Sequence, residues 1–232
     1  MTSSNRVVTL CGTRLSGCHH VCAFVDTRDG QYQILNPFLR EGIEAGEEVI
    51  TAVASGFQSE HLQRMRDGGI AVDAAIEAGQ LKLLASDKTY LKDGVFVAER
   101  MCVLLEEALR SAAQGPRGGV GVRGSADMDW VLRNLPTTDE LMAYEARVNL
   151  LTPRYDCTVV CMYDVNQCSG RVVADILATH SHVILDGKVH QNPYFVEPLA
   201  FLKKVALRRK HPAPVQKSPA ERRGAGRREA SG

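Results

Sequence analysis

Long apolar runs that do not alternate with polar residues constrain this chain more than any other feature. Residues 17–25 and 157–165 form the clearest runs, and shorter ones follow the same pattern at 47–53, 81–85 and 182–185. A strand that faces solvent on one side alternates apolar and polar residues, whereas a strand covered on both faces need not. Helical patterns separate the runs. The sequence therefore predicts a three-layer α/β fold, with a mostly parallel sheet and helices on both faces.

A net charge of +1 conceals a basic C-terminus. From Lys203 onward there are ten Lys or Arg and two Glu, a net charge of +8, while the rest of the chain has 18 basic and 25 acidic residues, a net charge of −7. Apolar periodicity is lost in the same stretch, which is typical of disorder. We predict a lead-in over residues 1–16, one folded domain over 17–202, and a solvated basic tail over 203–232 with weak, non-specific attraction to nucleic acid.

The seven cysteines indicate a reducing compartment. Their number is odd and most of them lie within apolar runs, unlike the disulfide framework of a small secreted protein. No stretch reaches the about 18–20 apolar residues of a membrane span, and the first residues lack a long apolar signal region. We expect a soluble, cytoplasmic protein with no membrane partner.

Two polar side chains stand out in the first apolar run. Alternate residues of a strand share a face, so His20 and Cys22 point the same way and His19 points the other. Cys161 and His180 are further candidates for one site with them. Each also has a structural interpretation, because a buried thiol packs as a small hydrophobe and a histidine is favourable at the end of a helix. The sequence leaves open whether His19 or His20 faces a site.

The motifs of the common enzyme classes are missing. The chain has no GxxxxGK[ST] phosphate-binding loop. Residues 119–124 spell GxGxxG, but they follow a predicted helix and are themselves a predicted strand, whereas a dinucleotide site needs a strand before the motif. No CxxC pair, HxxxH helix or cysteine-hydrolase signature is present. We predict no catalytic residue, cofactor or metal. A degenerate nucleotide-binding module and a Cys/His thiol or metal site remain the alternatives.

A series of short segments points to a known family. In chain order they are Gly17-x-His19-His20-Val21-Cys22-Ala23-Phe24, Asn36-Pro37-Phe38-Leu39-x-x-Gly42 with Gly46-Glu47, Thr89-Tyr90-Leu91-x-x-Gly94-x-Phe96, Val122-Arg123-Gly124 with Met128 and Trp130, Tyr144-Glu145, Cys161-x-Tyr163-Asp164, Thr179-His180 and Asn192-Pro193-x-Tyr194. The match covers about residues 15–196. This order resembles the MEDS domain, a sensory domain of methanogen and methylotroph regulators.

The resemblance implies a RecA/KaiC-like fold that lacks the nucleotide-hydrolysing loop. It also implies a non-enzymatic sensory role in transcriptional or signal-transduction control, with small hydrocarbon-derived compounds as ligands. The ligand-binding residues that it implies are His20, Cys22, Cys161, His180, Trp130 and Arg123. This chain departs from the family pattern at Asp127, where Glu is usual. MEDS domains often adjoin a DNA-binding or kinase-like domain, for which this chain has no room, so we expect a free-standing sensor that acts through a regulatory protein partner.

Overall fold

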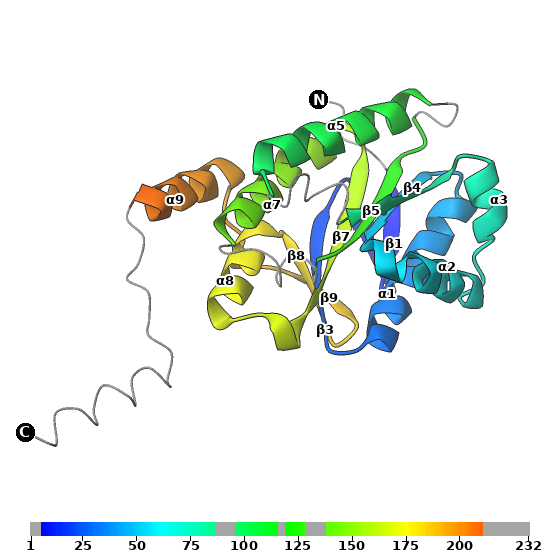
Figure 1. Cartoon of the computed structure of the whole chain (residues 1–232), viewed down its shortest axis with the longest axis horizontal. Helices are drawn as coiled ribbons and strands as arrows, with labels where there is room; N and C mark the ends of the chain where they lie inside the picture. The colour runs from blue at the N-terminus through cyan, green and yellow to red at the C-terminus, as the bar shows by residue number, and fades with distance from the viewer. Residues whose placement is uncertain (1–5, 87–95, 116–118, 129–137, 211–232) are drawn as a thin grey trace, which may run out of the picture.

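The structure is a computed structural model that describes residues 6–86, 96–115, 119–128 and 138–210. Its described part contains a seven-stranded sheet that runs through the middle of the molecule (Figure 1). The strands are β3 (His20–Val25), β4 (Glu48–Val53), β5 (Leu81–Ala85), β6 (Val122–Asp127), β7 (Cys157–Asp164), β8 (His182–Leu185) and β9 (Lys188–Gln191). Their order is β5-β4-β6-β7-β3-β8-β9, and β9 alone among them pairs antiparallel. The predicted mostly parallel sheet is confirmed.

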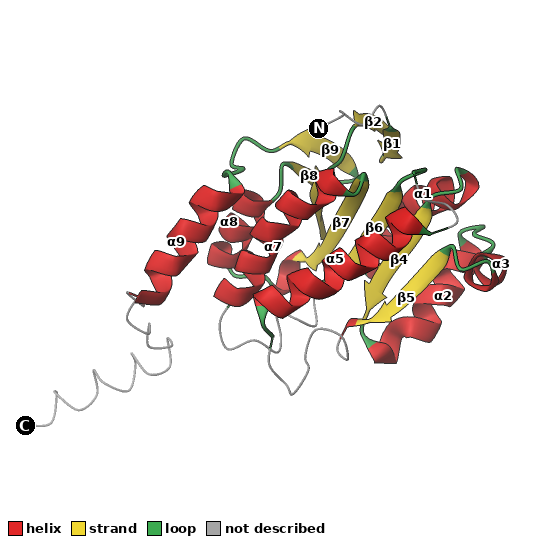
Figure 2. Cartoon of the chain, turned by 90° about the horizontal axis from the view of Figure 1, so that it is seen from above, coloured by secondary structure: helices red, strands yellow, loops and turns green. Residues whose placement is uncertain are grey.

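Helices cover both faces of this sheet (Figure 2). One face packs against α1, α2, α3 and a small hairpin, and the other face packs against α5, α7, α8 and α9. The bounds of these elements are α1 (Arg28–Glu44), α2 (Gln58–Asp67), α3 (Val72–Glu77), α5 (Ala98–Gln114), α7 (Asp139–Leu151), α8 (Gly170–Thr179), α9 (Pro198–Lys210), β1 (Val7–Leu10) and β2 (Thr13–Ser16). The single-turn helices are η1 (Ser55–Phe57), η3 (Thr152–Arg154) and η4 (Val165–Gln167).

The period of two along the strands decides which core each residue joins. Val21 and Ala23 of β3 pack in the core beneath α1, whereas Cys22 packs in the core beneath α5 and α7. Strand β7 divides in the same way, with Val160 on the α1 side and Cys161 on the α7 side. The predicted parity of the first run is confirmed, and it places His20 on the face covered by α7.

Helix α1 begins earlier than predicted. The sequence predicts a turn at residues 26–30 and a helix that starts at Pro37, but the helix starts at Arg28 and contains Pro37. The reason is a strong start signal in that turn. Thr27 has extended backbone angles and its side chain accepts a hydrogen bond from the Gly30 N–H, while Asp29 is in the first turn.

The ordered chain also continues past the predicted end of the domain. Helix α9 reaches Lys210, so residues 203–210 are helical and the predicted boundary of the tail was wrong. Arg208 binds the buried Asp175 through two contacts of 2.5 and 2.6 Å, which fastens α9 to α8. Residues 211–232 lie outside the described residues. Strand β9 was not predicted, because its polar residues form no apolar run.

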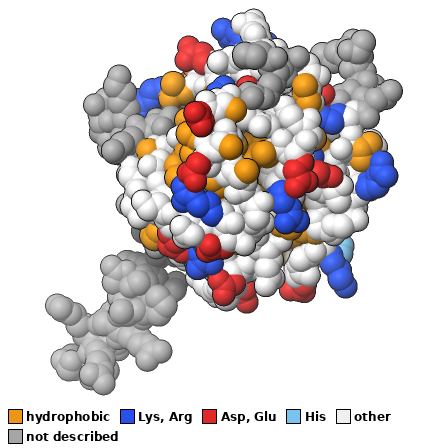
Figure 3. Space-filling view, turned by 90° about the vertical axis from the view of Figure 1, so that its right-hand side faces the viewer, with side chains coloured by type: hydrophobic (Ala, Val, Ile, Leu, Met, Phe, Trp, Pro, Cys, Tyr) orange, Lys and Arg blue, Asp and Glu red, His pale blue; other side chains and the backbone are white. Residues whose placement is uncertain are grey.

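The described surface carries charges of both signs. Figure 3 shows Lys and Arg side chains interspersed with Asp and Glu, and apolar side chains between them, on the right-hand side of the molecule in Figure 1. No helix in the described part of the chain is long and apolar enough to cross a membrane.

Candidate functional site

Four elements bring four titratable side chains to one buried point on the α7 side of the sheet. His20 is the first residue of β3, Cys161 is in the middle of β7, and His180 is the C-cap residue directly after α8. Glu145 joins them from α7. Their ligand atoms all lie within 4.8 Å of one another, and none of the four residues is more than 3% exposed. We call His20, Glu145, Cys161 and His180 the buried cluster.

The carboxylate of Glu145 lies at the centre of the buried cluster. Its Oε2 is 3.1 Å from Nε2 of His20 and 3.5 Å from Nε2 of His180. The thiol of Cys161 lies 3.8 Å from the same oxygen and 3.4 Å from Nε2 of His20. The two imidazole rings are 4.0 Å apart between centroids. One oxygen therefore faces two imidazoles and one thiol.

Burial and mutual contact shift the pKa values in this cluster. Burial alone would raise the pKa of Glu145, but the two imidazoles beside its carboxylate outweigh burial and lower the pKa to about 2. Burial, helped by His180, lowers the pKa of His20 to about 4. Burial and the carboxylate of Glu145 raise the pKa of Cys161 well above its ordinary value. The Cys161 thiol is thus protonated when no metal is bound, although an imidazole nitrogen is within reach of its sulfur. This protonation disfavours a thiolate nucleophile.

The other predicted site residues have different surroundings. Cys22 is buried next to Cys161 in the sheet register, but its thiol contacts the carbonyl of His182 at 3.8 Å. His19 binds the Ser16 carbonyl and lies outside the cluster, whereas His20 is part of it. Trp130 lies outside the described residues.

Arg123 is separated from the cluster by the sheet. It lies on the α1 side, where its guanidinium binds Glu47 and Glu41 at 2.6 Å each and the Phe38 carbonyl at 2.8 Å. Arg6 also reaches Glu47, at 3.0 Å. The structure does not bring Arg123 to the cluster, and its contacts are those of a buried structural ion pair.

Sequence reasoning missed Glu145 as a site residue. A signal for it exists: it is an acidic residue inside a helix that is otherwise buried on nearly all sides, including its neighbours Tyr144 and Ala146. A charged residue in such a helix is rarely buried without a partner. The hydroxyl of Tyr163 was missed too. It is buried, and its ring packs edge-on against His180 at 6.0 Å.

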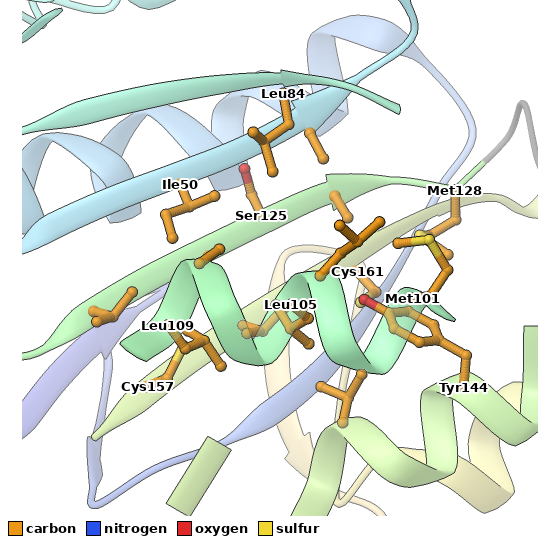
Figure 4. A pocket seen from close by; sticks show the side chains of 18 residues that line it. Ile50, Leu84, Met101, Leu105, Leu109, Ser125, Met128, Tyr144, Cys157 and Cys161 are labelled. Carbon is orange, nitrogen blue, oxygen red and sulfur yellow. The ribbon is translucent and has the colours of Figure 1, made fainter. Parts of the chain in front are cut away.

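An apolar cavity of about 190 Å³ adjoins the buried cluster. It lies between α5 and strands β4, β6 and β7, and Figure 4 shows Met101, Tyr144 and Cys161 near one end and Leu109 with Cys157 near the other. Ser125 and Tyr144 supply the only side-chain oxygens among the described residues that line it. Cys161 belongs to both the wall of this α5 cavity and the buried cluster.

In the described part of the chain, the connection after β3 is too short for a phosphate-binding loop. In open α/β sheets ligands bind beyond the carboxyl ends of the strands, and a Walker-type loop joins a strand to the next helix over about eight residues. Strand β3 connects to α1 through Asp26 and Thr27 alone. The glycines at 119 and 121 precede β6, at the opposite end of the strands.

Comparison with solved structures shows the same fold. A KaiC-like protein, PH0186, from Pyrococcus horikoshii OT3 matches with a TM-score of 0.56 and 10% identity, over 73% of this chain and 72% of that one. An uncharacterized protein, PH0321, from Pyrococcus horikoshii, solved with an unknown peptide, matches with a TM-score of 0.59 and 15% identity, over 74% and 78%. At these identities the likeness shows a RecA/KaiC-like fold alone.

Sequence comparisons identify the family. The transcriptional repressor DcmR of Methylorubrum extorquens is 28% identical over 162 residues, which cover 69% of this chain and 57% of the repressor. The chain thus spans little more than half the length of this curated relative. Residues 19–181 match the family described as the methanogen/methylotroph, DcmR sensory domain. Because this match includes well over half of the sequence, the chain belongs to the MEDS family of sensory domains.

Proposed function

We propose that this chain binds a small, mainly apolar molecule in the α5 cavity and signals its presence to a regulatory protein partner. Family membership gives the chain a sensory and regulatory role. The observation that carries the proposal is the cavity itself, which lies between the sheet and helices α5 and α7 and has an almost entirely apolar wall. Apolar cavities of about 150 Å³ stay dry and bind benzene, so about 190 Å³ suits a hydrocarbon derivative of that size.

Two features of the cavity wall support recognition rather than simple imperfect packing. Tyr144 and Cys161 place a hydroxyl and a thiol near one end of an otherwise apolar space, and ligand sites typically combine apolar walls with a few polar groups. Cys161 also contacts His20 and Glu145 within the buried cluster, so a ligand that displaces its sulfur would change both of these contacts. This contact gives ligand binding a physical route into the region where β3, β7 and α8 meet.

We infer that the role involves no catalysis. Burial raises the pKa of the thiols of Cys22 and Cys161, and both stay protonated in the metal-free chain. The two-residue connection after β3 leaves no space for a phosphate cradle. Binding of a nucleotide, the alternative that the glycine-rich segment suggests, has no comparable support in the described structure.

Thermal-shift and calorimetric titrations of the full chain test the proposal. The panel contains benzene, cyclohexane, short-chain alcohols, ATP and ADP. The variant Ala108→Leu fills the cavity from α5, and Ala113→Leu makes the same change on the exposed side of that helix. We expect at least one apolar compound to stabilise the wild type and Ala113→Leu, with an affinity at least about tenfold lower for Ala108→Leu. Stabilisation by nucleotide alone, or equal binding by both variants, would contradict the proposal.

A further inference from the structure

The atoms of the buried cluster are spaced like the ligands of a metal ion. With metal–ligand bonds of about 2.0–2.3 Å, a tetrahedral site separates nitrogen and oxygen ligands by about 3.4 Å and pairs that include sulfur by about 3.6 Å. The distances to Oε2 of Glu145 are 3.1 Å from His20 and 3.5 Å from His180. Sγ of Cys161 lies 3.4 Å from His20 and 3.8 Å from Glu145. These four of the six edges are within a few tenths of an ångström of the tetrahedral value, and the other two, from His180 to His20 and to Cys161, are no longer than 4.8 Å.

Hydrogen bonding around His180 leaves the lone pair of one ring nitrogen pointed at the centre of the buried cluster. Its Nδ1 lies 2.8 Å from the Ile176 carbonyl, which can only accept, so Nδ1 carries the proton and Nε2 of the neutral ring carries the lone pair. That Nε2 makes no hydrogen bond and faces a carboxylate oxygen, a second acceptor, at 3.5 Å. Two acceptors that face each other in a buried site need a metal ion or a proton between them. A backbone carbonyl that holds the far nitrogen is also the usual support of a metal-bound histidine.

The charges of the cluster balance with one divalent cation. Glu145 is fully buried and, among the described residues, its ion-pair partners are the imidazoles of His20 and His180. One carboxylate and one thiolate neutralise a 2+ ion, whereas two neutral imidazoles add no charge. A neutral site avoids the cost of an unpaired charge in the core. The second oxygen of Glu145, which lacks a hydrogen-bond partner, is available as well.

We propose that His20, Glu145, Cys161 and His180 bind one divalent transition-metal ion of the zinc class. Two imidazole nitrogens, one thiolate and one carboxylate form a borderline-soft set that suits Zn²⁺ and not the hard cations Mg²⁺ or Ca²⁺. The Cys161 thiol binds as the thiolate, and its proton passes to solvent as the metal enters. The proposal does not depend on a ligand in the α5 cavity, because the metal alone occupies the site.

Metal analysis and cobalt substitution of the untagged full chain test this proposal. We expect one equivalent of zinc to bind, and Co²⁺ in the same site to give tetrahedral d–d bands and a thiolate-to-metal charge-transfer band. Cys161→Ser removes the charge-transfer band, and Glu145→Gln or His180→Gln weakens the affinity by more than about 100-fold, since losing a direct ligand costs more than losing its support. Cys22→Ser is the matched control, because Cys22 is the buried register neighbour of Cys161 and lies outside the cluster.

The wild type and the control alone are sufficient to overturn the proposal. Circular dichroism first shows that both are folded. A folded wild type that takes up no zinc or cobalt contradicts the proposal, and so does a charge-transfer band that disappears in Cys22→Ser. Full affinity in a folded Cys161→Ser or Glu145→Gln would place the metal elsewhere. A nitrogen-15 spectrum of zinc-treated protein could instead show His180 as an imidazolium without a bound metal. A proton would then take the place of the cation, and the cluster would need no metal.

Discussion

Replacing Leu109 by Ala enlarges the α5 cavity and lowers the free energy of unfolding by a measurable amount. Leu109 is 1% exposed and lines the cavity from α5. Removing three buried carbons costs about 2.4 kcal/mol at about 0.8 kcal/mol each. The vacated space opens into an existing cavity and does not collapse, which adds a cavity term and puts the total near 4 kcal/mol, in the upper part of the range for Leu→Ala changes.

Urea unfolding with and without a cavity-sized compound measures this cost and its recovery. Leu39→Ala is the matched control, because Leu39 is fully buried in the core on the other face of the sheet. Both variants lose stability. A compound at about 100 times its Kd returns about 2.7 kcal/mol to any variant that binds it, and we expect its Kd to differ from the wild-type value in Leu109→Ala but not in Leu39→Ala, which keeps the α5 cavity intact. A loss below about 1.5 kcal/mol for Leu109→Ala, or a Kd that changes in Leu39→Ala and not in Leu109→Ala, would refute the placement of the ligand beneath α5.

Two further predictions concern buried polar groups away from the cluster. His61 is held between Tyr32 and Thr51, and burial lowers its pKa to about 4 from 6.5. Its folded-state pKa lies below the unfolded one, so stability falls as the pH drops from about 6.5 toward 4. From pH 7 to pH 5 the free energy of unfolding falls by about 2 kcal/mol more in the wild type than in His61→Gln. Urea titrations that give parallel curves of stability against pH for the two proteins would contradict this. Arg123→Met leaves the buried Glu47 with Arg6 as its remaining cation and costs about 3–5 kcal/mol in the same assay, while the affinity for an apolar ligand stays unchanged. A folded Arg123→Met that loses ligand affinity would instead support the role that the family resemblance implies for Arg123.

The sheet and the faces of its strands were predictable because they depend on local pattern. Continuous apolar runs predict strands covered on both sides, and the period of two assigns His20 and Cys22 to one face before any coordinates are known. The start of α1 was misjudged for a local reason as well. Residues such as Thr27 and Asp29 are favourable both in turns and at helix N-termini, and the sequence does not say which applies.

The candidate site was only partly predictable because it depends on how distant elements meet. The positions of His20, Cys161 and His180 follow from parity and family resemblance, but their separation does not. Glu145 becomes part of the site only because helices surround α7 and leave its carboxylate no route to water. The α5 cavity is a gap in packing between a helix and a sheet, which no pattern of residue types records.

Binding of xenon by crystals of the full chain tests the central claim most directly, because xenon enters small dry apolar cavities. The account predicts xenon density between α5 and the sheet, in contact with Leu109 at one end of the cavity or with Tyr144 at the other, and no such density in Ala108→Leu. A wild-type crystal without xenon at that position, or equal density in the cavity-filling variant, would contradict the claim that this cavity is the binding site of the sensor.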